Sequence, residues 1–319
     1  MLGPAGPPHP FGSALGDARQ RLLARLERSL GCPGCGQPFE RSGELQGSEL
    51  VCQRCGTCGR LEDDQFVFGG FTREEVAADW LNRFKTAARQ RIGPWYGLLT
   101  RIVSPVYFGP DIVRPFLQTF DLDLELVADL GCGTTEHDDL VVAVDGVAYP
   151  NVHVITDLEK LPFQNDSLSG VLSIAVLHHV ADPRANVVEM RRVLRPGGRA
   201  LCYIPFIQGY HASPHDYQRF TQSGVAKLFG DFELVRIGLG AGPTSGMLWV
   251  LQEWLAMVLS CGSVRLYRLL LPLTWVLFPL KFLDAILIRH PAAHVIASGF
   301  LIEVRKPAHA STAPAIASV

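Results

Sequence analysis

The sequence has no excess of basic residues. Its 319 residues contain 29 Lys and Arg against 31 Asp and Glu, which gives a formal net charge of -2. A protein that mainly binds nucleic acid neutralises phosphates with Lys and Arg. The charge balance therefore argues against nucleic acid as the principal partner.

The N-terminus lacks the features of a signal peptide. Residues 1–16 read MLGPAGPPHPFGSALG, which is rich in Pro and Gly and has no basic stretch followed by an apolar one. We therefore expect a disordered leader over 1–16 and a cytoplasmic protein. The end of the chain, 306–319, is expected to be a disordered tail.

The sequence also lacks a long uninterrupted apolar run, although it is hydrophobic overall. Hydrophobic residues make up 48% of the chain, and they are concentrated in 247–288. Within that segment the uncharged stretch 269–280 is shorter than the roughly 20 residues that span a bilayer, which disfavours a transmembrane helix. Three readings remain open: a lid over an apolar acceptor, a homodimer face, or a peripheral membrane contact. The basic residues that flank or interrupt the segment are Arg265, Arg268, Lys281 and Arg289.

Cysteine, in contrast, is grouped near the N-terminus. Two Cys-x-x-Cys pairs are separated by the spacing of a zinc ribbon, in which two knuckles present four thiolates to one ion. Such a closed thiolate shell predicts structural Zn²⁺, held by a zinc-ribbon-like module over 17–70 that opens with an amphipathic helix. Cys58 is an alternative ligand, because it forms a third such pair with Cys55. The predicted ligands are Cys32, Cys35, Cys52 and Cys55.

A helical connector is expected over 71–120, because Thr72 and Glu75 form a capping box. The main domain, 121–305, alternates buried-strand patterns with turns and a helix, which predicts an α/β doubly wound, mostly parallel seven-stranded sheet of the Rossmann-like kind. A hydrophobic helical insert at about 245–292 precedes the last strand. The expected strands are the apolar run ELVADLGCG at 125–133, which ends in glycines, and the segments 141–144, 152–155, 170–175, 199–204, 232–237 and 295–305.

Several residues follow these strands where a doubly wound sheet binds its ligand. Gly131 and Gly133 would let the backbone approach a ligand, although an ordinary glycine turn has the same pattern. Asp145 ends the next strand, where a carboxylate can accept hydrogen bonds from ribose hydroxyls. Asp157 could accept a hydrogen bond from an adenine amino group while Leu158 covers the ring. The sequence therefore predicts a nucleoside site at this edge.

These motifs, together with LPF at 161–163, LHHV at 177–180 and RVLRPGG at 192–198, resemble the class I S-adenosylmethionine-dependent methyltransferase superfamily over roughly 122–232. The resemblance implies a methyltransferase that binds S-adenosyl-L-methionine. The family pattern has a further glycine after GCGT and a full first helix, whereas here only TTEHDDL intervenes, so we expect that helix to be short or absent. The cofactor residues that the resemblance implies are Asp129, Gly131 and Gly133 at the methionine end, Asp145 at the ribose, and Asp157 and Leu158 at the adenine.

The methyl acceptor is expected near two groups of histidines. Methyl transfer is an in-line displacement that needs alignment and, for a hydroxyl or amine acceptor, a base. The first group follows the fourth strand and the second follows the fifth strand; capping of a helix or a structural lid are the alternatives. The candidate catalytic residues are His178, His179, His211, His215, Asp216 and Tyr217.

Three functions are consistent with the sequence. The first is an S-adenosylmethionine-dependent methyltransferase that acts on a small-molecule, glycan or lipid-linked acceptor. The second is a ribosomal RNA methyltransferase, because such enzymes carry a similar four-cysteine module; the acidic residues between 40 and 64 oppose this. The third is a non-catalytic binding or scaffold protein that retains the fold after losing the cofactor site.

Overall fold

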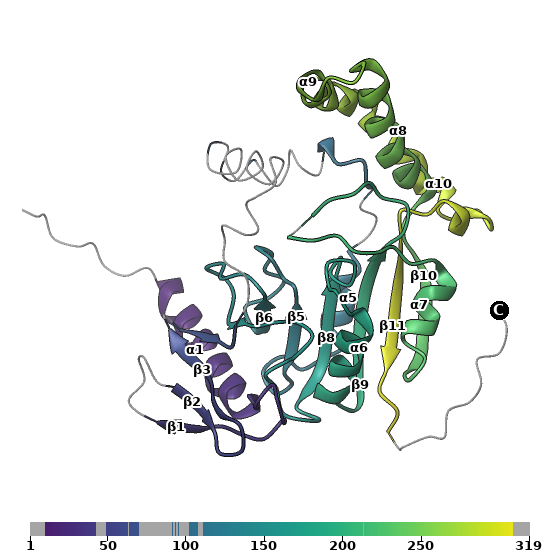
Figure 1. The fold of residues 1–319 in the computed structure, drawn as a ribbon. Helices are drawn as coiled ribbons and strands as arrows, with labels where there is room; N and C mark the ends of the chain where they lie inside the picture. Colours follow the sequence, from purple (N-terminus) through teal and green to yellow (C-terminus); the bar gives the residue numbers. More distant parts are fainter. Residues whose placement is uncertain are drawn as a thin grey trace, which may run out of the picture.

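The computed structural model describes residues 10–42, 49–62, 64–69, 91, 93, 95, 102–107, 111–212 and 214–308. These residues form one twisted sheet with helices on both faces and a helical projection at one end (Figure 1). The capping box of Thr72 and Glu75, most of the predicted connector, the first nine residues and most of the predicted tail lie outside the described residues.

The main domain contributes seven strands in the spatial order β7-β6-β5-β8-β9-β11-β10. The strands from β7 to β9 are parallel, whereas β11 runs antiparallel to both of its neighbours. This order reverses direction at β5, as a doubly wound sheet does, so the predicted Rossmann-like fold is confirmed. The strands are β5 (Val127–Leu130), β6 (Val141–Asp145), β7 (Val154–Ile155), β8 (Leu168–Ile174), β9 (Leu194–Pro205), β10 (Glu233–Ala241) and β11 (Gly299–Arg305).

The predicted strand count of seven is wrong for the sheet as a whole, because the described residues form an eleven-stranded sheet. The cysteine-rich segment adds four strands, and its last strand pairs in parallel with β7 through Phe66 opposite Val154 and Val67 opposite Ile155. An edge strand offers unpaired backbone groups to any extended segment nearby, and hydrophobic patterning does not reveal such a pairing. The added strands are β1 (Glu40–Ser42), β2 (Glu49–Cys52), β3 (Gly56–Glu62) and β4 (Gln65–Val67).

The N-terminal helix α1 (Pro10–Ser29) begins seven residues earlier than expected, so part of the predicted leader is helical. Proline is tolerated in the first turn of a helix, where its missing N–H would have no partner. The helix buries Leu22 and Leu26 in the same core cluster as Ala128 and Val142. It lies on the same face of the sheet as α6 (Pro183–Val193) and α7 (Gln222–Leu228), with α5 (Val113–Leu117) on the other face (Figure 1).

The connection between β5 and β6 contains turns and no helix in residues 131–140. This agrees with the expectation that the first helix of the domain is short or absent. In contrast, the connection from β8 to β9 is a full helix, α6. Asp182 caps α6 by accepting hydrogen bonds from the backbone N–H groups of Arg184 and Ala185, and Pro183 occupies the first helical position.

The predicted hydrophobic insert is a helical hairpin. One arm is α8 (Pro243–Leu259), and the other is formed by α9 (Val264–Thr274), the 3₁₀ helix η1 (Trp275–Leu283) and α10 (Asp284–Leu287). The hairpin rises beyond the end of the sheet at which β9 ends (Figure 1), and a short 3₁₀ helix, η2 (Ala293–Val295), then leads to β11.

The base of the hairpin is fixed by the buried carboxylate of Asp284. It accepts hydrogen bonds from the backbone N–H groups of Thr244 (2.7 Å) and Ser245 (2.8 Å) and from the Ser245 hydroxyl (2.6 Å). These are the first residues of α8, so a carboxylate from one arm caps the helix of the other. The two arms are therefore joined at the base by buried polar contacts.

The rest of the hairpin exposes large apolar side chains. The arm Val264–Leu287 has 24 residues and contains an 18-residue window with a mean hydropathy of 1.7, so it is long and apolar enough to cross a membrane by length and composition alone. The sequence-based prediction against a transmembrane helix rests on the uncharged stretch 269–280 alone, whereas the helical arm also includes the charged residues on either side of it. The side chains exposed by more than half include Trp254, Met257, Leu259, Val264, Leu269, Leu273, Val276 and Ile286.

Candidate active site and cysteine cluster

The turn after β5 has the backbone conformation that its glycines predict. Gly131 (φ +73°) and Gly133 (φ +57°) both lie in the left-handed region. A β-carbon on Gly131 would come within 2.5 Å of a methyl group of Val176, so the turn packs directly against the segment that follows β8. Glycine is therefore required at this position both for its conformation and for the close approach.

Asp145, at the end of β6, lies against this turn. One carboxylate oxygen accepts a hydrogen bond from the backbone N–H of Gly133 (2.8 Å), and the other accepts one from that of Val147 (2.9 Å). Burial raises the pKa of Asp145, and the neighbouring N–H groups partly oppose this. Each carboxylate oxygen can accept a second hydrogen bond. Asp145 thus orders the glycine turn while retaining acceptor capacity for a ligand.

Asp129 is the most deeply buried of the predicted cofactor residues, with 4% of its surface exposed. Burial, together with the negative charge of Asp145, raises its pKa to about 7. The ring of His137 lies beside it, with Nε2 3.6 Å from a carboxylate oxygen of Asp129, and burial lowers the pKa of His137. A carboxyl group with this pKa is partly protonated near neutral pH.

Asp157 and Leu158 follow β7, and the backbone places them beside Asp145. The N–H of Thr156 donates a hydrogen bond to the Asp145 carbonyl (3.0 Å). Asp157 is exposed and Leu158 is half-buried, as expected for residues that would contact a ligand at the edge of the sheet. The structure thus gathers the six predicted cofactor residues at the carboxyl ends of three neighbouring strands.

A cavity of about 330 Å³ lies beside this group, lined among others by Asp129, Val141, Ala143 and His153. Val141 and Ala143 alternate along β6 with residues that pack under α1, so they point to the opposite face of the sheet. A helix between β5 and β6 would cover such a face. The cavity therefore lies over the face next to the helix-free connection.

Three of the predicted catalytic histidines meet at one point. The rings of His178, His179 and His211 offer nitrogen atoms that all lie within 4.8 Å of one another. Burial and the neighbouring histidines lower the pKa of His178 to about 2, and burial also lowers the pKa of His179. These two rings are therefore neutral at physiological pH.

The other three predicted catalytic residues surround this cluster without joining it. The His215 backbone carbonyl contacts Nδ1 of His179 (2.5 Å), whereas its ring is exposed beside Tyr217. The Asp216 carboxylate accepts hydrogen bonds from the Arg219 guanidinium and from the backbone N–H of His211 (2.8 Å). Asp216 therefore holds the loop that presents His211.

Sequence reasoning missed Trp249, which belongs to α8. Its ring stacks on His211 with centroids 5.7 Å apart and an interplanar angle of 20°. The hydrophobic insert thus forms one side of the histidine cluster. Trp249 and His211 are 38 positions apart, so no local sequence pattern predicts their contact.

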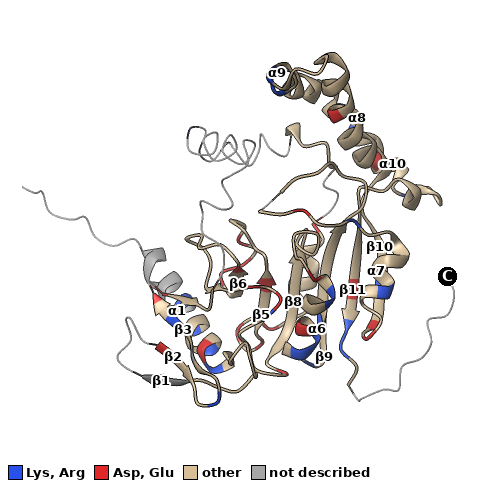
Figure 2. Ribbon diagram, viewed as in Figure 1, with Lys and Arg blue, Asp and Glu red and all other residues tan. Residues whose placement is uncertain are grey.

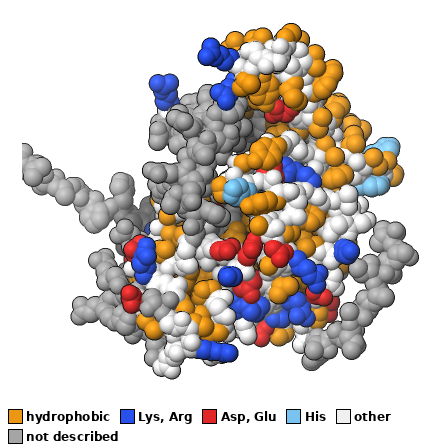
Figure 3. Space-filling model, in the orientation of Figure 1, with side chains coloured by type: hydrophobic (Ala, Val, Ile, Leu, Met, Phe, Trp, Pro, Cys, Tyr) orange, Lys and Arg blue, Asp and Glu red, His pale blue; other side chains and the backbone are white. Residues whose placement is uncertain are grey.

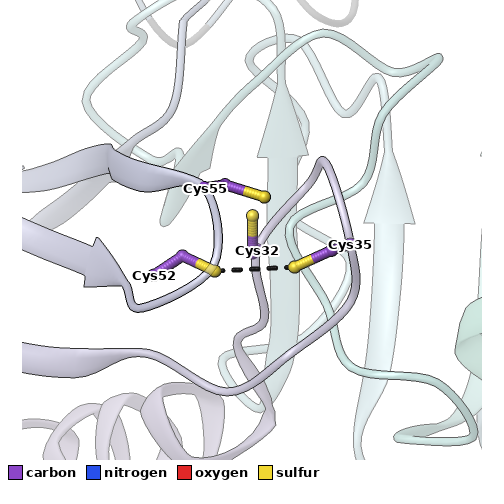
Figure 4. Close-up of side chains that lie close together, drawn as sticks. All are labelled: Cys32, Cys35, Cys52 and Cys55. Carbon is purple, nitrogen blue, oxygen red and sulfur yellow. Dashed lines mark hydrogen bonds between the residues drawn. The ribbon is translucent and has the colours of Figure 1, made fainter.

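The predicted zinc ligands also converge (Figure 4). The sulfur atoms of Cys32, Cys35, Cys52 and Cys55 all lie within 4.8 Å of one another, and those of Cys35 and Cys52 are 3.5 Å apart. Four Zn–S bonds of about 2.3 Å in a tetrahedron place sulfur atoms roughly 3.8 Å apart, so the cluster fits zinc. Cys58 remains close, with its sulfur 3.3 Å from that of Cys32.

The backbone around these cysteines supports two knuckles. Gly36 (φ +70°) follows Cys35, and Gly56 (φ +85°) follows Cys55, so each pair closes in a left-handed glycine. Burial raises the pKa of the Cys32 thiol, but a hydrogen bond with Cys58 and nearby backbone N–H groups lower it to about 7. Hydrogen bonds with the neighbouring thiols raise the pKa of Cys55 to about 12, so Cys32 is the first of these thiols to supply the thiolate that a metal ion requires.

Residues 128–202 match the methyltransferase-domain family. This match covers the turn, Asp145, Asp157 and the first histidine pair, and it lies within a sheet that has the doubly wound order. Residues 128–202 are therefore similar in sequence to methyltransferase domains, and the sheet around them has the Rossmann-like order.

Curated relatives of the methyltransferase domain match only part of the chain. A human protein, "Probable tRNA methyltransferase 9B", is 32% identical over 108 residues, which is 29% of this chain and 24% of that protein. A malonyl-[acyl-carrier protein] O-methyltransferase of Hahella chejuensis is 43% identical over 58 residues, or 18% of this chain and 20% of that protein. The chain thus spans about a quarter or less of the length of these relatives.

Solved structures resemble the methyltransferase domain more distantly. The [4+2]-cyclase SpnF is 15% identical with a TM-score of 0.40, and the similarity covers 69% of this chain and 96% of that one. Phosphoethanolamine N-methyltransferase 2 of Haemonchus contortus, in complex with S-adenosyl-L-methionine, is 14% identical with a TM-score of 0.39, covering 70% and 60%.

Proposed function

We propose that the protein is an S-adenosylmethionine-dependent methyltransferase. The observation that supports this most is the glycine turn after β5, which is ordered by Asp145 and followed at the next strand end by Asp157 and Leu158. When bound, the cofactor supplies an electrophilic methyl group. The chain would hold it with the Gly131–Gly133 turn and Asp129 at the methionine end, Asp145 at the ribose, and Asp157 with Leu158 at the adenine.

The acceptor would bind at the histidine side of this turn. Val176 packs on Gly131, and the N–H of His179 donates a hydrogen bond to the Val176 carbonyl (2.8 Å), so the histidine segment is fixed to the cofactor turn. His178 is fully buried, and it is suited to positioning rather than to proton transfer. His179, His211, His215, Asp216 and Tyr217 remain the candidates that contact or position the acceptor.

Within the class of small-molecule, glycan or lipid-linked acceptors, we favour a lipid-linked one at a membrane surface. The hairpin exposes apolar side chains along both arms, and Figure 3 shows them gathered at that end of the molecule. Its exposed charges are basic: Arg265 and Arg268 lie on α9, and Arg289 follows α10. Anionic lipid headgroups complement this pattern.

Among the described residues 243–289, the hairpin has no acidic side chain on its exposed surface. Asp284 is buried at the base, and Glu253 is half-buried in a hydrogen bond with the Tyr267 hydroxyl. A homodimer interface or a lid would not need this one-sided charge. The proposal is supported if the protein is a monomer in solution and co-sediments with anionic lipid vesicles. It is contradicted if the protein is a stable dimer that does not co-sediment with them.

The cysteine module is proposed to hold a structural Zn²⁺ ion with Cys32, Cys35, Cys52 and Cys55. All four positions of a tetrahedral ion are filled by thiolates, which leaves none for a substrate. The module packs on the domain through the N–H of Gly31, which donates to the Pro162 carbonyl (3.0 Å), and through β4. Its role in this proposal is to stabilise the edge of the sheet next to the adenine residues.

A direct test of the activity is mass spectrometry of small molecules released from the purified protein. We expect S-adenosylmethionine or S-adenosylhomocysteine to co-purify with the wild type and to be lost with Asp145→Ala. Asp166→Ala is a matched control, because this exposed carboxylate pairs with Lys306 on the other side of the domain. Retention of the cofactor by both variants would contradict the assigned site.

An RNA methyltransferase is the second candidate, favoured by the similarity to "Probable tRNA methyltransferase 9B". It predicts a continuous basic face across the cysteine module and the site. On the face shown, basic and acidic side chains are interspersed (Figures 2 and 3). A salt-dependent shift of labelled tRNA by the protein would favour this candidate over the lipid-linked acceptor.

A further inference from the structure

The histidine cluster carries an inference that does not depend on the methyl-transfer activity. We propose that His178, His179 and His211 form a second metal site, which binds a Zn²⁺-like divalent transition-metal ion through three imidazole nitrogens and leaves a fourth position open. This site is separate from the cysteine cluster in both its ligands and its location, since these histidines follow β8 and β9.

The spacing of the rings fits a metal ion. Nε2 of His178 lies 3.2 Å from Nε2 of His211. Two Zn–N bonds of about 2.0–2.1 Å at a tetrahedral angle place the nitrogen atoms roughly 3.3 Å apart. The separation of these two nitrogen atoms is therefore that of two ligands of one ion.

The outer nitrogens of two rings are already held by backbone carbonyls. Nδ1 of His211 lies 3.1 Å from the Gly209 carbonyl oxygen, and Nδ1 of His179 lies 2.5 Å from the His215 carbonyl oxygen. A carbonyl only accepts, so each Nδ1 carries the proton and each Nε2 presents a lone pair. This is the tautomer and the second contact that metal-binding histidines commonly have.

Protein partners alone do not satisfy the cluster. His178 is fully buried, and its Nδ1 atom has no hydrogen-bond partner among the described residues. Two neighbours of the cluster also have buried nitrogens without a partner there: Nε1 of Trp249, which stacks on His211, and Nε of Arg219, which binds Asp216. Unpaired buried polar atoms are costly. An ion on Nε2 of His178 would leave Nδ1 of that ring unpaired, so Trp249 and Arg219 are the two neighbours whose unpaired N–H groups an exogenous ligand of the ion would satisfy.

The chemistry of the ligands selects the ion. Imidazole nitrogen suits Zn²⁺, Co²⁺ and Ni²⁺, whereas Mg²⁺ and Ca²⁺ prefer oxygen. Three histidines with one open position are typical of ions that exchange a water molecule for an oxygen or nitrogen ligand from outside the protein. An acceptor hydroxyl or amine is a ligand of that class, and in that case the three rings act as ligands and none acts as a base.

The test is the metal content of the full-length protein after saturation with zinc and removal of excess ion, measured by inductively coupled plasma mass spectrometry. We expect two zinc ions per wild-type chain and one per chain in His211→Ala and in His179→Ala. His294→Ala is the matched control, because this exposed histidine lies on η2, and it should retain two ions. One ion per chain in the wild type, or two in every histidine variant, would overturn the proposal.

Cobalt substitution separates loss of the site from loss of the fold. Thiolate-to-cobalt charge-transfer absorption reports the cysteine cluster alone, and we expect it at equal intensity in the wild type and both histidine variants. The histidine variants should bind one cobalt ion fewer than the wild type, and the ion they lose should be the one that gives no thiolate band. If that equivalent persists in the variants while the thiolate band is intact, the histidines do not bind the ion. Cofactor binding is measured separately, so failure of the methyltransferase proposal would leave this result interpretable.

Discussion

The cysteine module and the helical hairpin are attached to the same domain in opposite ways. The module joins the sheet through β4 and the core through Leu22 and Leu26, and it presents its cysteines to one another. The hairpin is held to the domain by Asp284 at its base, by Trp249 stacked on His211 and by Lys281, which donates to the carbonyls of Ile102 and Ser104, and it leaves the apolar sides of its helices exposed. The module is thus part of the folded core, whereas the hairpin presents an exposed apolar surface, which we propose contacts a membrane.

The largest effect is expected from removing the metal of the cysteine module. Cys52→Ser, or treatment with a strong chelator, should lower the melting temperature by about 10 °C or more, because binding of a structural metal contributes directly to folding. Differential scanning calorimetry measures this. Cys261→Ser, at an exposed cysteine of the hairpin tip, is the control and should leave the melting temperature unchanged. Equal melting temperatures for both variants would show that the module is not part of the core.

A second prediction concerns Asp129, which lies in the sheet to which the cysteine module and the hairpin are both attached. Its folded-state pKa of about 7 lies above the ordinary value of 3.8, because burial disfavours the charge. Between about pH 4 and pH 7 the unfolded chain loses this proton while the folded protein keeps it, so stability falls as pH rises. At about 1.36 kcal/mol per pKa unit, Asp129→Asn should add at most about 4 kcal/mol above pH 7 and almost nothing below pH 4.

Denaturant unfolding at several pH values measures this effect. A gain that is the same at pH 4 and pH 8 would contradict the assignment to a buried, ionising Asp129. Asp129→Asn should change neither the zinc content nor vesicle binding, because the cysteine module and the hairpin lie outside this part of the sheet.

The base of the hairpin should be the next most sensitive position. Asp284→Ala leaves the N–H groups of Thr244 and Ser245 buried without an acceptor and should cost about 3 kcal/mol of unfolding free energy. Asp284→Asn keeps one acceptor oxygen and should cost less. Gly242→Ala tests the same contact from the other side, since its β-carbon would come within 2.4 Å of Cγ of Asp284. If Asp284→Ala unfolds like the wild type in urea, the base does not fix the hairpin.

Substitutions on the exposed face of the hairpin should have the smallest effect on stability. They should have a large effect on vesicle binding. Leu269→Asp with Val276→Asp should change the unfolding free energy by less than about 0.5 kcal/mol, because these side chains are 67% and 75% exposed. The double variant should lose most co-sedimentation with anionic vesicles. Val188→Asp, on α6 and 51% exposed, should bind vesicles as the wild type does. Loss of binding in both would point to a non-specific effect of charge.

Much of this arrangement could be predicted from local patterns. The glycine turn, the acid at the end of β6 and the cysteine pairs are encoded by residues close in sequence, and the structure places them as expected. The parallel order of the main sheet also follows from alternating strands, turns and α6. Hydrophobic content alone was sufficient to locate the hairpin, although not to show which of its sides are exposed.

The remaining features depend on contacts between distant residues. The pairing of β4 with β7 joins residues about ninety positions apart, so the strand count could not be read from either segment. The helix over Pro10–Ser29 begins before the predicted start at Asp17, although its buried residues Leu22 and Leu26 lie in the predicted part. The convergence of His211 with His178 and His179 likewise requires the folded loop that Asp216 and Arg219 hold.

The central claim is that the ends of β5, β6 and β7 bind the nucleoside of the methyl donor, and isothermal titration calorimetry with S-adenosylhomocysteine tests it most directly. We expect one binding site per wild-type chain and an affinity reduced by at least about tenfold in Asp145→Ala and in Asp157→Ala. The affinity should be unchanged in the hairpin variant Leu269→Asp with Val276→Asp. Absence of binding to the zinc-loaded wild-type protein, or equal affinity in the wild type and Asp145→Ala, would contradict it.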